Sequence, residues 1–149
     1  MTSINLTNLA KIGQLDPVPW SADLVKRMLA TAKQRLRDAE FTQNSEETRF
    51  DCAYTTIRAV ADIGLHLNGF RTSTSKPGHH QTAIQCLAHT LGVDAATVRV
   101  LDGLRKQRNL ADYDGELVTE AALNECLNQA RAMVTRIERV LRDHPELGA

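Results

Sequence analysis

The stretch LRKQRNLADY, residues 104–113, places charged side chains at helix positions where the spacing calls for apolar ones. On a helical wheel of about 100° per residue, the apolar positions define one arc: Val98, Leu101, Leu104 and Ala111. Arg105, Arg108 and Asp112 fall within the same arc. A guanidinium directed toward a core or a partner surface is costly unless it is paired or faces a ligand. The stretch therefore predicts either an ion-pair network or a ligand site on this helix.

Composition is that of an ordinary soluble globular protein. The chain has 149 residues, of which 42% are hydrophobic and 24% charged, and this length is typical of one domain. Aromatic residues make up only 4%, so the core must be mainly aliphatic, which favours helices over sheets. The 18 basic residues equal the 18 acidic ones. Binding to a polyanion would therefore depend on a local patch rather than on net charge.

Helical periodicity and capping residues predict an all-α fold. We expect an N-terminal arm over residues 1–19, with a short helix over 3–12, followed by a helical bundle over residues 20–149. Residues 16–19 have the composition of a linker and residues 71–78 that of a polar loop. No segment alternates with period two for long enough to predict a strand. Five main helices are expected: from Ser21 to about residue 41, from Ser45 to Gly69, from His79 to Leu91, from Asp94 to about Tyr113, and from Thr119 past Leu141.

Cysteine usage and hydropathy predict a cytoplasmic protein. Cys52, Cys86 and Cys126 lie on or beside apolar helix stripes, as expected for buried, reduced thiols. Their spacing does not fit a zinc site, and no histidine pair adds ligands at helical spacing, so no metal or cofactor is expected. No apolar stretch reaches the ~18 residues that would indicate a membrane span.

Four tracts of the sequence resemble the HEPN domain family, and the likeness covers about residues 20–142. They are FDCAYTTIRAVA (50–61), GFR (69–71), GHH (78–80) and LDGLRKQRNLADY (101–113). The resemblance implies a helical bundle that usually forms a homodimer. It also implies a prokaryotic defence or stress setting, because many HEPN domains are metal-independent ribonucleases of toxin–antitoxin, abortive-infection or CRISPR-associated systems.

The family motif is an arginine, often followed by a polar residue, with a histidine after four to six intervening residues. Arg108 and Asn109 match its first part, and Tyr113 stands at the first position that the histidine would occupy. A histidine can transfer protons near neutral pH because its pKa is about 6.5, whereas tyrosine has a pKa near 10. Because the histidine is missing, the resemblance implies a degenerate site that binds rather than cleaves.

Three interpretations of the motif follow. The first is a binding or interaction module for RNA, a nucleotide or a cognate protein, with ligand-binding residues at Arg105, Arg108, Asp112, Lys76, His79 and His80. The second is a metal-independent endoribonuclease with a variant site of Arg108, Asn109 and Tyr113, assisted by His79 or His80. The third is a purely structural dimer in which the motif forms the seam.

Two expectations connect this motif to the rest of the chain. Without a ligand, Arg108 should pair with Asp112 or with an acid such as Asp51 or Asp62. His79 and His80 open a helix just after Lys76-Pro77-Gly78, and free N–H groups at a helix start attract anions. If the fold brings this helix start beside Arg108, either histidine would replace the missing one.

Overall fold

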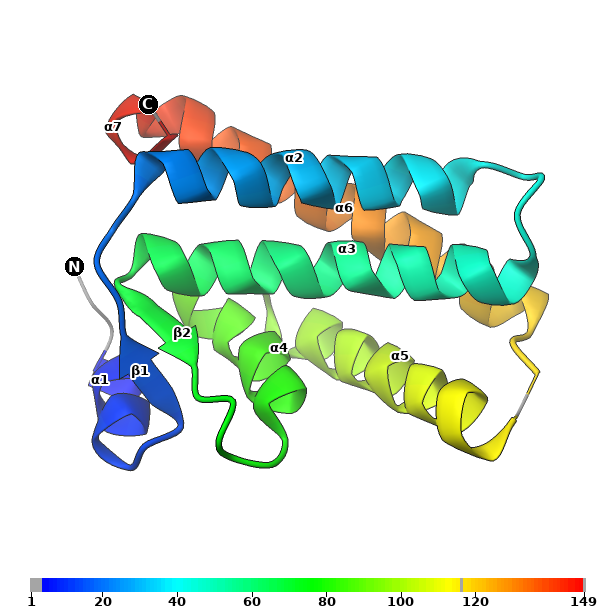
Figure 1. The fold of residues 1–149 in the computed structure, drawn as a ribbon, viewed down its shortest axis with the longest axis horizontal. Helices are drawn as coiled ribbons and strands as arrows, with labels where there is room; N and C mark the ends of the chain where they lie inside the picture. Colours follow the sequence, from blue (N-terminus) through cyan, green and yellow to red (C-terminus); the bar gives the residue numbers. More distant parts are fainter. Residues whose placement is uncertain (1–3, 116, 149) are drawn as a thin grey trace.

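The computed structural model describes residues 4–115 and 117–148, in which seven helices and two short strands follow one another. Figure 1 shows their arrangement. In chain order they are α1 (Ile4–Lys11), β1 (Leu15–Pro17), α2 (Ala22–Glu40), α3 (Glu46–Leu67), β2 (Phe70–Thr72), α4 (His79–Thr90), α5 (Ala95–Asp114), α6 (Glu120–Asp143) and α7 (Pro145–Gly148). The expected bundle of five main helices is therefore present as α2 to α6.

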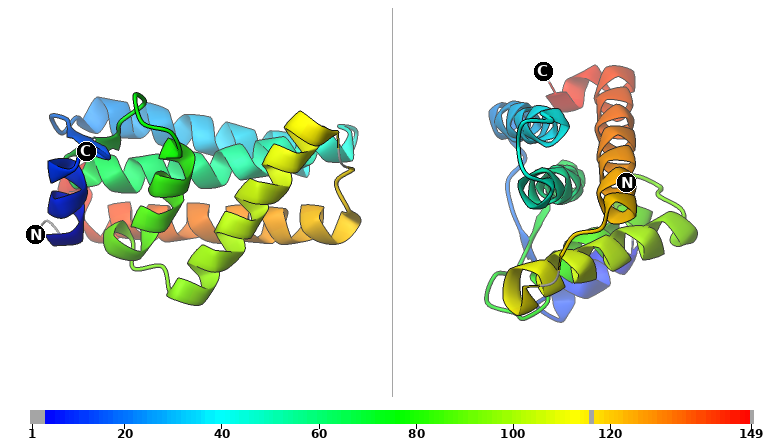
Figure 2. Two further views of the ribbon diagram at one scale, coloured as in Figure 1. Left: turned by 90° about the horizontal axis from the view of Figure 1, so that it is seen from below. Right: turned by 90° about the vertical axis from the view of Figure 1, so that its right-hand side faces the viewer.

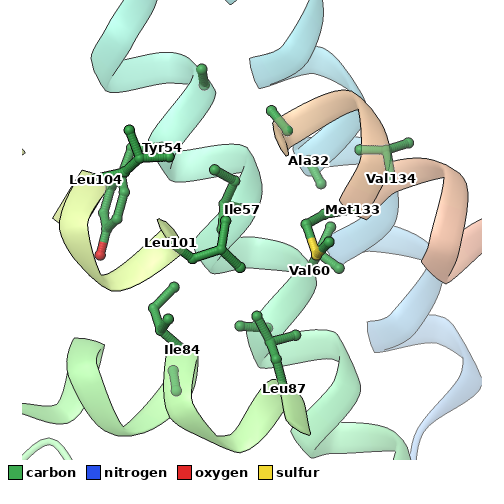
Figure 3. Close-up of a cluster of buried hydrophobic side chains, with 14 of the residues drawn as sticks. Ala32, Tyr54, Ile57, Val60, Ile84, Leu87, Leu101, Leu104, Met133 and Val134 are labelled. Carbon is green, nitrogen blue, oxygen red and sulfur yellow. The ribbon is translucent and has the colours of Figure 1, made fainter. Parts of the chain in front are cut away.

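Helix α3 is the centre of the bundle, and α2, α4, α5 and α6 all pack against it. It lies between α2 on one side and the α4–α5 pair on the other, while α6 crosses behind α2 and α3 (Figures 1 and 2). Ile57 and Val60 of α3 are buried. They point into a cluster that includes Leu87 of α4 and Met133 of α6 (Figure 3). The core is mainly aliphatic, as the low aromatic content predicts, and Phe50 and Tyr54 are buried in it.

Side-chain caps set the starts of four of the main helices, as the sequence predicts. The side chains of Ser21, Ser45, Asp94 and Thr119 each accept a hydrogen bond from the backbone N–H three residues later. The helix expected over residues 3–12 is observed as α1, and residue 3 lies outside the described residues. Gly115 follows α5 at φ 69°, a left-handed conformation that glycine adopts without strain. The helix boundaries are therefore close to those predicted.

The described residues are mostly helical, as the predicted all-α fold requires, but the sequence did not predict a short two-stranded sheet. The segment expected to be a linker forms β1, which pairs antiparallel with β2 in the segment expected to be a loop, with Leu15 opposite Thr72. The backbone N–H of Val18 extends the pairing by donating to the Gly69 carbonyl at 2.9 Å. Strands of three residues are too short to show a period of two. Leu6 and Leu15 are buried in the core, so α1 and β1 are packed against the bundle.

The cysteines and the hydropathy of the helices agree with the sequence-based expectations. Cys86 and Cys126 are buried and Cys52 is partly buried, and all three are free thiols. Burial raises the pKa of the Cys86 thiol to about 11, so this group is protonated at neutral pH. Among the described residues, no helix combines the length and apolar character needed to cross a membrane.

Two glycines within helices should respond oppositely to added side chains. A Cβ on Gly64 of α3 would lie 2.8 Å from Oγ1 of Thr90 and 3.2 Å from Cγ of Leu91. We expect Gly64→Leu to lower the free energy of unfolding by about 1–3 kcal/mol through overpacking. A Cβ on Gly103 of α5 would meet nothing within 4 Å, so Gly103→Ala should raise it by about 0.5–1 kcal/mol. Urea denaturation measures both, and similar values for the two variants would contradict the close packing of α3 on α4.

Candidate functional site

A row of polar and aromatic side chains runs along one face of α3. Its members are spaced three or four residues apart, so that they lie one above another on the helix: Asp51, Tyr54, Arg58, Asp62 and His66. This row, called here the α3 row, meets α5 at its first residues and the start of α4 at Arg58. Its last member contacts the start of α2. The candidate site is built along this row.

Arg108 of α5 binds the first part of the α3 row. Its Nε lies 3.1 Å from Oδ1 of Asp51 and 3.1 Å from Oδ2 of Asp112. Its guanidinium carbon lies 5.5 Å from the centre of the Tyr54 ring, within the range of a cation–π contact. The pairing of Arg108 with Asp112 and Asp51 is thus confirmed, whereas Asp62 is not among its partners. The side chains of Arg108, Asp51 and Asp112 are 25%, 50% and 43% exposed. Ion pairs this accessible to water add little stability, and an incoming anion can reach them.

Arg105 is the more buried of the two arginines on the apolar arc of α5. Its side chain is only 14% exposed, and its Nε donates to Oδ1 of Asp102 at 2.8 Å. Asp102 has a second cation at 3.6 Å, Nζ of Lys106. Both arginines that the sequence singled out therefore carry paired charges close to the protein interior.

The structure places His80 of α4 close to arginines of α3 and α5. Nη1 of Arg58 lies 3.0 Å from Nε2 of His80. Because a guanidinium only donates, Nε2 accepts and the ring proton belongs on Nδ1. Burial lowers the pKa of His80 most, and with the positive charges of Arg58, His79, Arg108 and Arg105, in that order, brings it to about 4. His80 is consequently neutral at pH 7. Arg58, His80, Arg105 and Arg108 are called here the arginine cluster.

Two members of the α3 row have polar atoms without a partner in the part of the chain that the structure describes. The Tyr54 hydroxyl is buried and makes no hydrogen bond, and its ring lies beside Leu104 of α5 (Figure 3). The Asp62 carboxylate, for which no hydrogen bond or ion pair is found among these residues, is desolvated. Burial raises its pKa to about 6, although the charges of Arg58 and His79 oppose the rise. Polar groups left unpaired in this way are uncommon in native proteins and often mark function.

Asp62 makes the fold less stable at neutral pH than at acidic pH. Its pKa in the folded protein, about 6, lies above the ordinary value of 3.8. The folded state therefore holds the proton more tightly than the unfolded state, and this contribution to stability is lost as pH rises from about 4 to 6. An ionised carboxylate that costs stability is consistent with a role in binding.

Asn109, Tyr113 and Lys76 lie apart from the arginine cluster. Tyr113 is 81% exposed. Together with Asn109 it lines a shallow depression at the outer end of α5, along with Lys106, Leu110 and Asp114. The structure thus does not place Tyr113 where the motif histidine would act on a group held by Arg108. Lys76 lies against the turn after α1, where a Cβ on Gly13 would be 3.3 Å from its Cε.

Two hollows adjoin the second half of the α3 row. One, of about 380 Å³, lies between α2 and α3 and is lined by Arg27, Met28, Thr31, Arg58, Ala59 and Asp62. The other, of about 450 Å³, is lined by Val18, Pro19, Leu24, Met28, Asp62, His66, Phe70, Arg71, Thr72 and Thr74. They share Met28 and Asp62. The sequence did not predict these hollows, because part of the wall of the larger one comes from β2, and a strand of three residues is too short to show a period of two.

The arrangement is suited to holding an anion. Positive charge from α3 and α5 converges on the start of α4, and the neutral His80 ring lies within it. Across residues 4–115 and 117–148, no group of three or more His, Cys, Asp or Glu side chains is placed to hold a metal ion. No family model, curated protein or solved structure matches the chain.

Proposed function

We propose that the protein is a HEPN-like module that binds the phosphate of RNA or of a nucleotide at the arginine cluster. The observation that carries this proposal is the convergence of Arg58, Arg105 and Arg108 on His80. Burial and the charges of these arginines together lower the pKa of His80, and positive charges that converge on one place attract a phosphate. Arginine is well suited to this task because its planar fork of donors matches phosphate oxygens.

Arg58 is the arginine most available to a ligand. Among the described residues no carboxylate lies within ion-pair distance of it, whereas Arg105 and Arg108 pair with Asp102, Asp51 and Asp112. Its one direct polar partner is the neutral His80 ring. A phosphate beside Arg58 would therefore break no direct ion pair, although the charge of Asp62 on the same helix also acts on Arg58.

The start of α4 adds backbone donors to the same place. Gly78 precedes α4 in a left-handed conformation and provides no side-chain cap. The first N–H groups of a helix have no partner within the helix, and together with the helix dipole they attract phosphate. His79 and His80 are the first two residues of this helix, so these donors lie next to Arg58.

Fluorescence anisotropy with a labelled single-stranded RNA of mixed sequence tests the proposal. We expect binding whose affinity falls linearly with salt on logarithmic axes, as release of counterions from phosphates requires. Competition with an unlabelled mononucleotide distinguishes the two ligand sources, because only a nucleotide site would be blocked by it at moderate concentration. An RNA affinity that is absent at low salt, together with no mononucleotide binding, would reject the proposal.

Metal-independent cleavage of RNA is the second candidate function, and the position of His80 favours it. A neutral imidazole can accept a proton and His80 comes from a different helix from the motif arginine, although its pKa of about 4 makes it a weak base. RNA incubated in the presence of EDTA should then be cut by the wild type and not by His80→Ala. Equal cleavage by both proteins would exclude His80, and no cleavage by either would leave the binding module alone.

Homodimer formation belongs to the same proposal, since HEPN-like domains usually pair. Leu110, Tyr113 and Leu117 are exposed apolar or aromatic side chains at and beyond the outer end of α5, and such side chains favour contact with another protein surface. A purely structural dimer, or a complex with a cognate protein of a prokaryotic defence system, would use the same surface without any ligand. Sedimentation equilibrium with and without RNA separates a dimer that binds from a dimer that does not.

A further inference from the structure

We propose that the 450 Å³ hollow between α2, α3 and β2 binds a guanine base, with the Asp62 carboxylate accepting hydrogen bonds from N1–H and the exocyclic N2–H₂. This inference rests on the phosphate site proposed above, since the base and the phosphate would belong to one nucleotide. It deepens that proposal by naming the base.

The hollow has the size and walls of a small-molecule site. Such sites are commonly about 300–1,000 Å³, mainly apolar, with a few polar groups that fix orientation. Leu24, Met28 and Phe70 supply apolar wall, and Phe70 provides the aromatic face on which proteins stack unpaired bases. The β1–β2 pairing holds Phe70 opposite Pro17, so this wall is built into the fold.

The Asp62 carboxylate selects guanine because its oxygens have no hydrogen-bond donor of their own in the described part of the chain. No hydrogen-bond donor reaches its carboxylate within residues 4–115 and 117–148, although it lies in the hollow. An ionised carboxylate is only an acceptor. Guanine presents two adjacent donors on its Watson–Crick edge, whereas adenine and uracil present one beside an acceptor. Arg71 and Thr72 line the same hollow; their side chains carry donors that would serve the guanine O6, although Nε of Arg71 also lies 4.0 Å from Oδ2 of Asp16.

The position of the hollow connects the base to the arginine cluster. Asp62 also lines the neighbouring hollow that contains Arg27 and Arg58. Arg58 and Asp62 are one turn apart on α3, about 6 Å along the helix axis. One nucleotide can therefore place its base against Asp62 while its phosphate reaches Arg58.

Calorimetry with GMP, AMP, CMP and XMP on the wild type and on Asp62→Asn is the direct test. We expect GMP to bind the wild type about tenfold or more tightly than the other three. In Asp62→Asn the amide donates where the carboxylate accepted, so GMP should lose about tenfold while XMP, which has a carbonyl at C2, gains. The variant should fold, because it removes a desolvated charge. The proposal is overturned if GMP is not preferred, or if Asp62→Asn leaves the preference unchanged.

The pH dependence gives a second readout of the same carboxylate. Asp62 must be ionised to accept both bonds, and with its pKa of about 6 the ionised fraction falls about tenfold between pH 7 and pH 5. GMP affinity of the wild type should fall accordingly. The other groups that face the hollows are Arg58 and His66 on α3, Arg27 on α2, Arg71 on β2 and His79 on α4. Asp62→Asn retains all of these, and the GMP phosphate, with its second pKa near 6, titrates in both experiments, so an equal fall in the variant would assign the effect to these groups or the phosphate and overturn the role of Asp62.

Different results would reject the proposed base site and the proposed phosphate site, so the two proposals can be told apart. If RNA binds through Arg58 and no mononucleotide shows a base preference, the guanine proposal is wrong and the proposed function stands. If guanosine without a phosphate binds as tightly as GMP and RNA does not bind, the base site stands and the phosphate site falls. GMP binding that weakens both in Asp62→Asn and in Arg58→Gln supports the two sites together.

Discussion

Replacing Arg58 by Gln is expected to weaken the binding of single-stranded RNA about 10- to 100-fold at low salt. Hydrogen bonds to a charged group contribute about 1.5–3 kcal/mol each, and about 1.4 kcal/mol corresponds to a factor of ten in affinity. Arg58 has no carboxylate within ion-pair distance among the described residues, although the charge of Asp62 one turn away acts on it, so a phosphate can bind it without breaking a direct ion pair. The slope of log affinity against log salt should fall by about 0.7, the value for one phosphate contact on a single strand.

Arg131→Gln is the matched control for this experiment. It removes the same charge, and Arg131 pairs with Glu40 across α6 and α2 at 2.8 Å, apart from the contacts of the arginine cluster. A general effect of net charge would weaken RNA binding equally in both variants, whereas a site at the arginine cluster affects only Arg58→Gln. Equal losses, or an unchanged salt slope in Arg58→Gln, would contradict the proposed phosphate site. Thermal melting of both proteins shows whether either loss is due to unfolding.

The helices were predictable because their signals are local. The expected helix caps form through hydrogen bonds between residues only three positions apart in the sequence, at Ser21, Ser45, Asp94 and Thr119. The sheet depends on contacts between positions far apart in the sequence, such as Leu15 with Thr72. With three residues each, neither strand is long enough to show a period of two in the sequence. The two segments form strands because they pair with each other in the folded protein.

The candidate site was predictable only in part for a similar reason. The apolar arc of α5 identified Arg105 and Arg108 as residues in need of partners, and the structure supplies those partners. It could not identify Arg58 as their neighbour, because Arg58 belongs to another helix and only the packing of α3 against α5 and α4 brings it close to them. His66 was not among the predicted site residues, yet its Nε2 accepts from the Ser21 N–H at 3.2 Å. The packing of α4 and α2 on α3 places His80 beside Arg58 and Ser21 beside His66.

Replacing Leu101 by Ala is expected to lower the free energy of unfolding by about 2–5 kcal/mol, the range for removing a fully buried leucine side chain. Leu101 and Leu104 are the only two residues of α5 that are buried, although the helix has 20 residues. Leu101 is 0% exposed and points toward Ile57 and Ile84 (Figure 3). The cavity left by Leu101→Ala cannot close without moving α5, since α3 and α4 fix its other walls. Urea denaturation by circular dichroism measures the loss.

Val100→Ala on the same helix is the control, because Val100 is 38% exposed and its truncation should change stability by no more than about 0.5 kcal/mol.

Hydrogen exchange tests how firmly α5 is held against the rest of the bundle. With so few buried anchors, α5 should open before α3, and Leu101→Ala should speed exchange along α5 much more than along α3. Opening of α5 removes Arg105 and Arg108 from the α3 row while Arg58 and His80 stay in place. Under conditions where Leu101→Ala is folded, this variant should therefore lose less RNA affinity than Arg58→Gln. A larger loss in Leu101→Ala would place the phosphate site on α5 and not at Arg58.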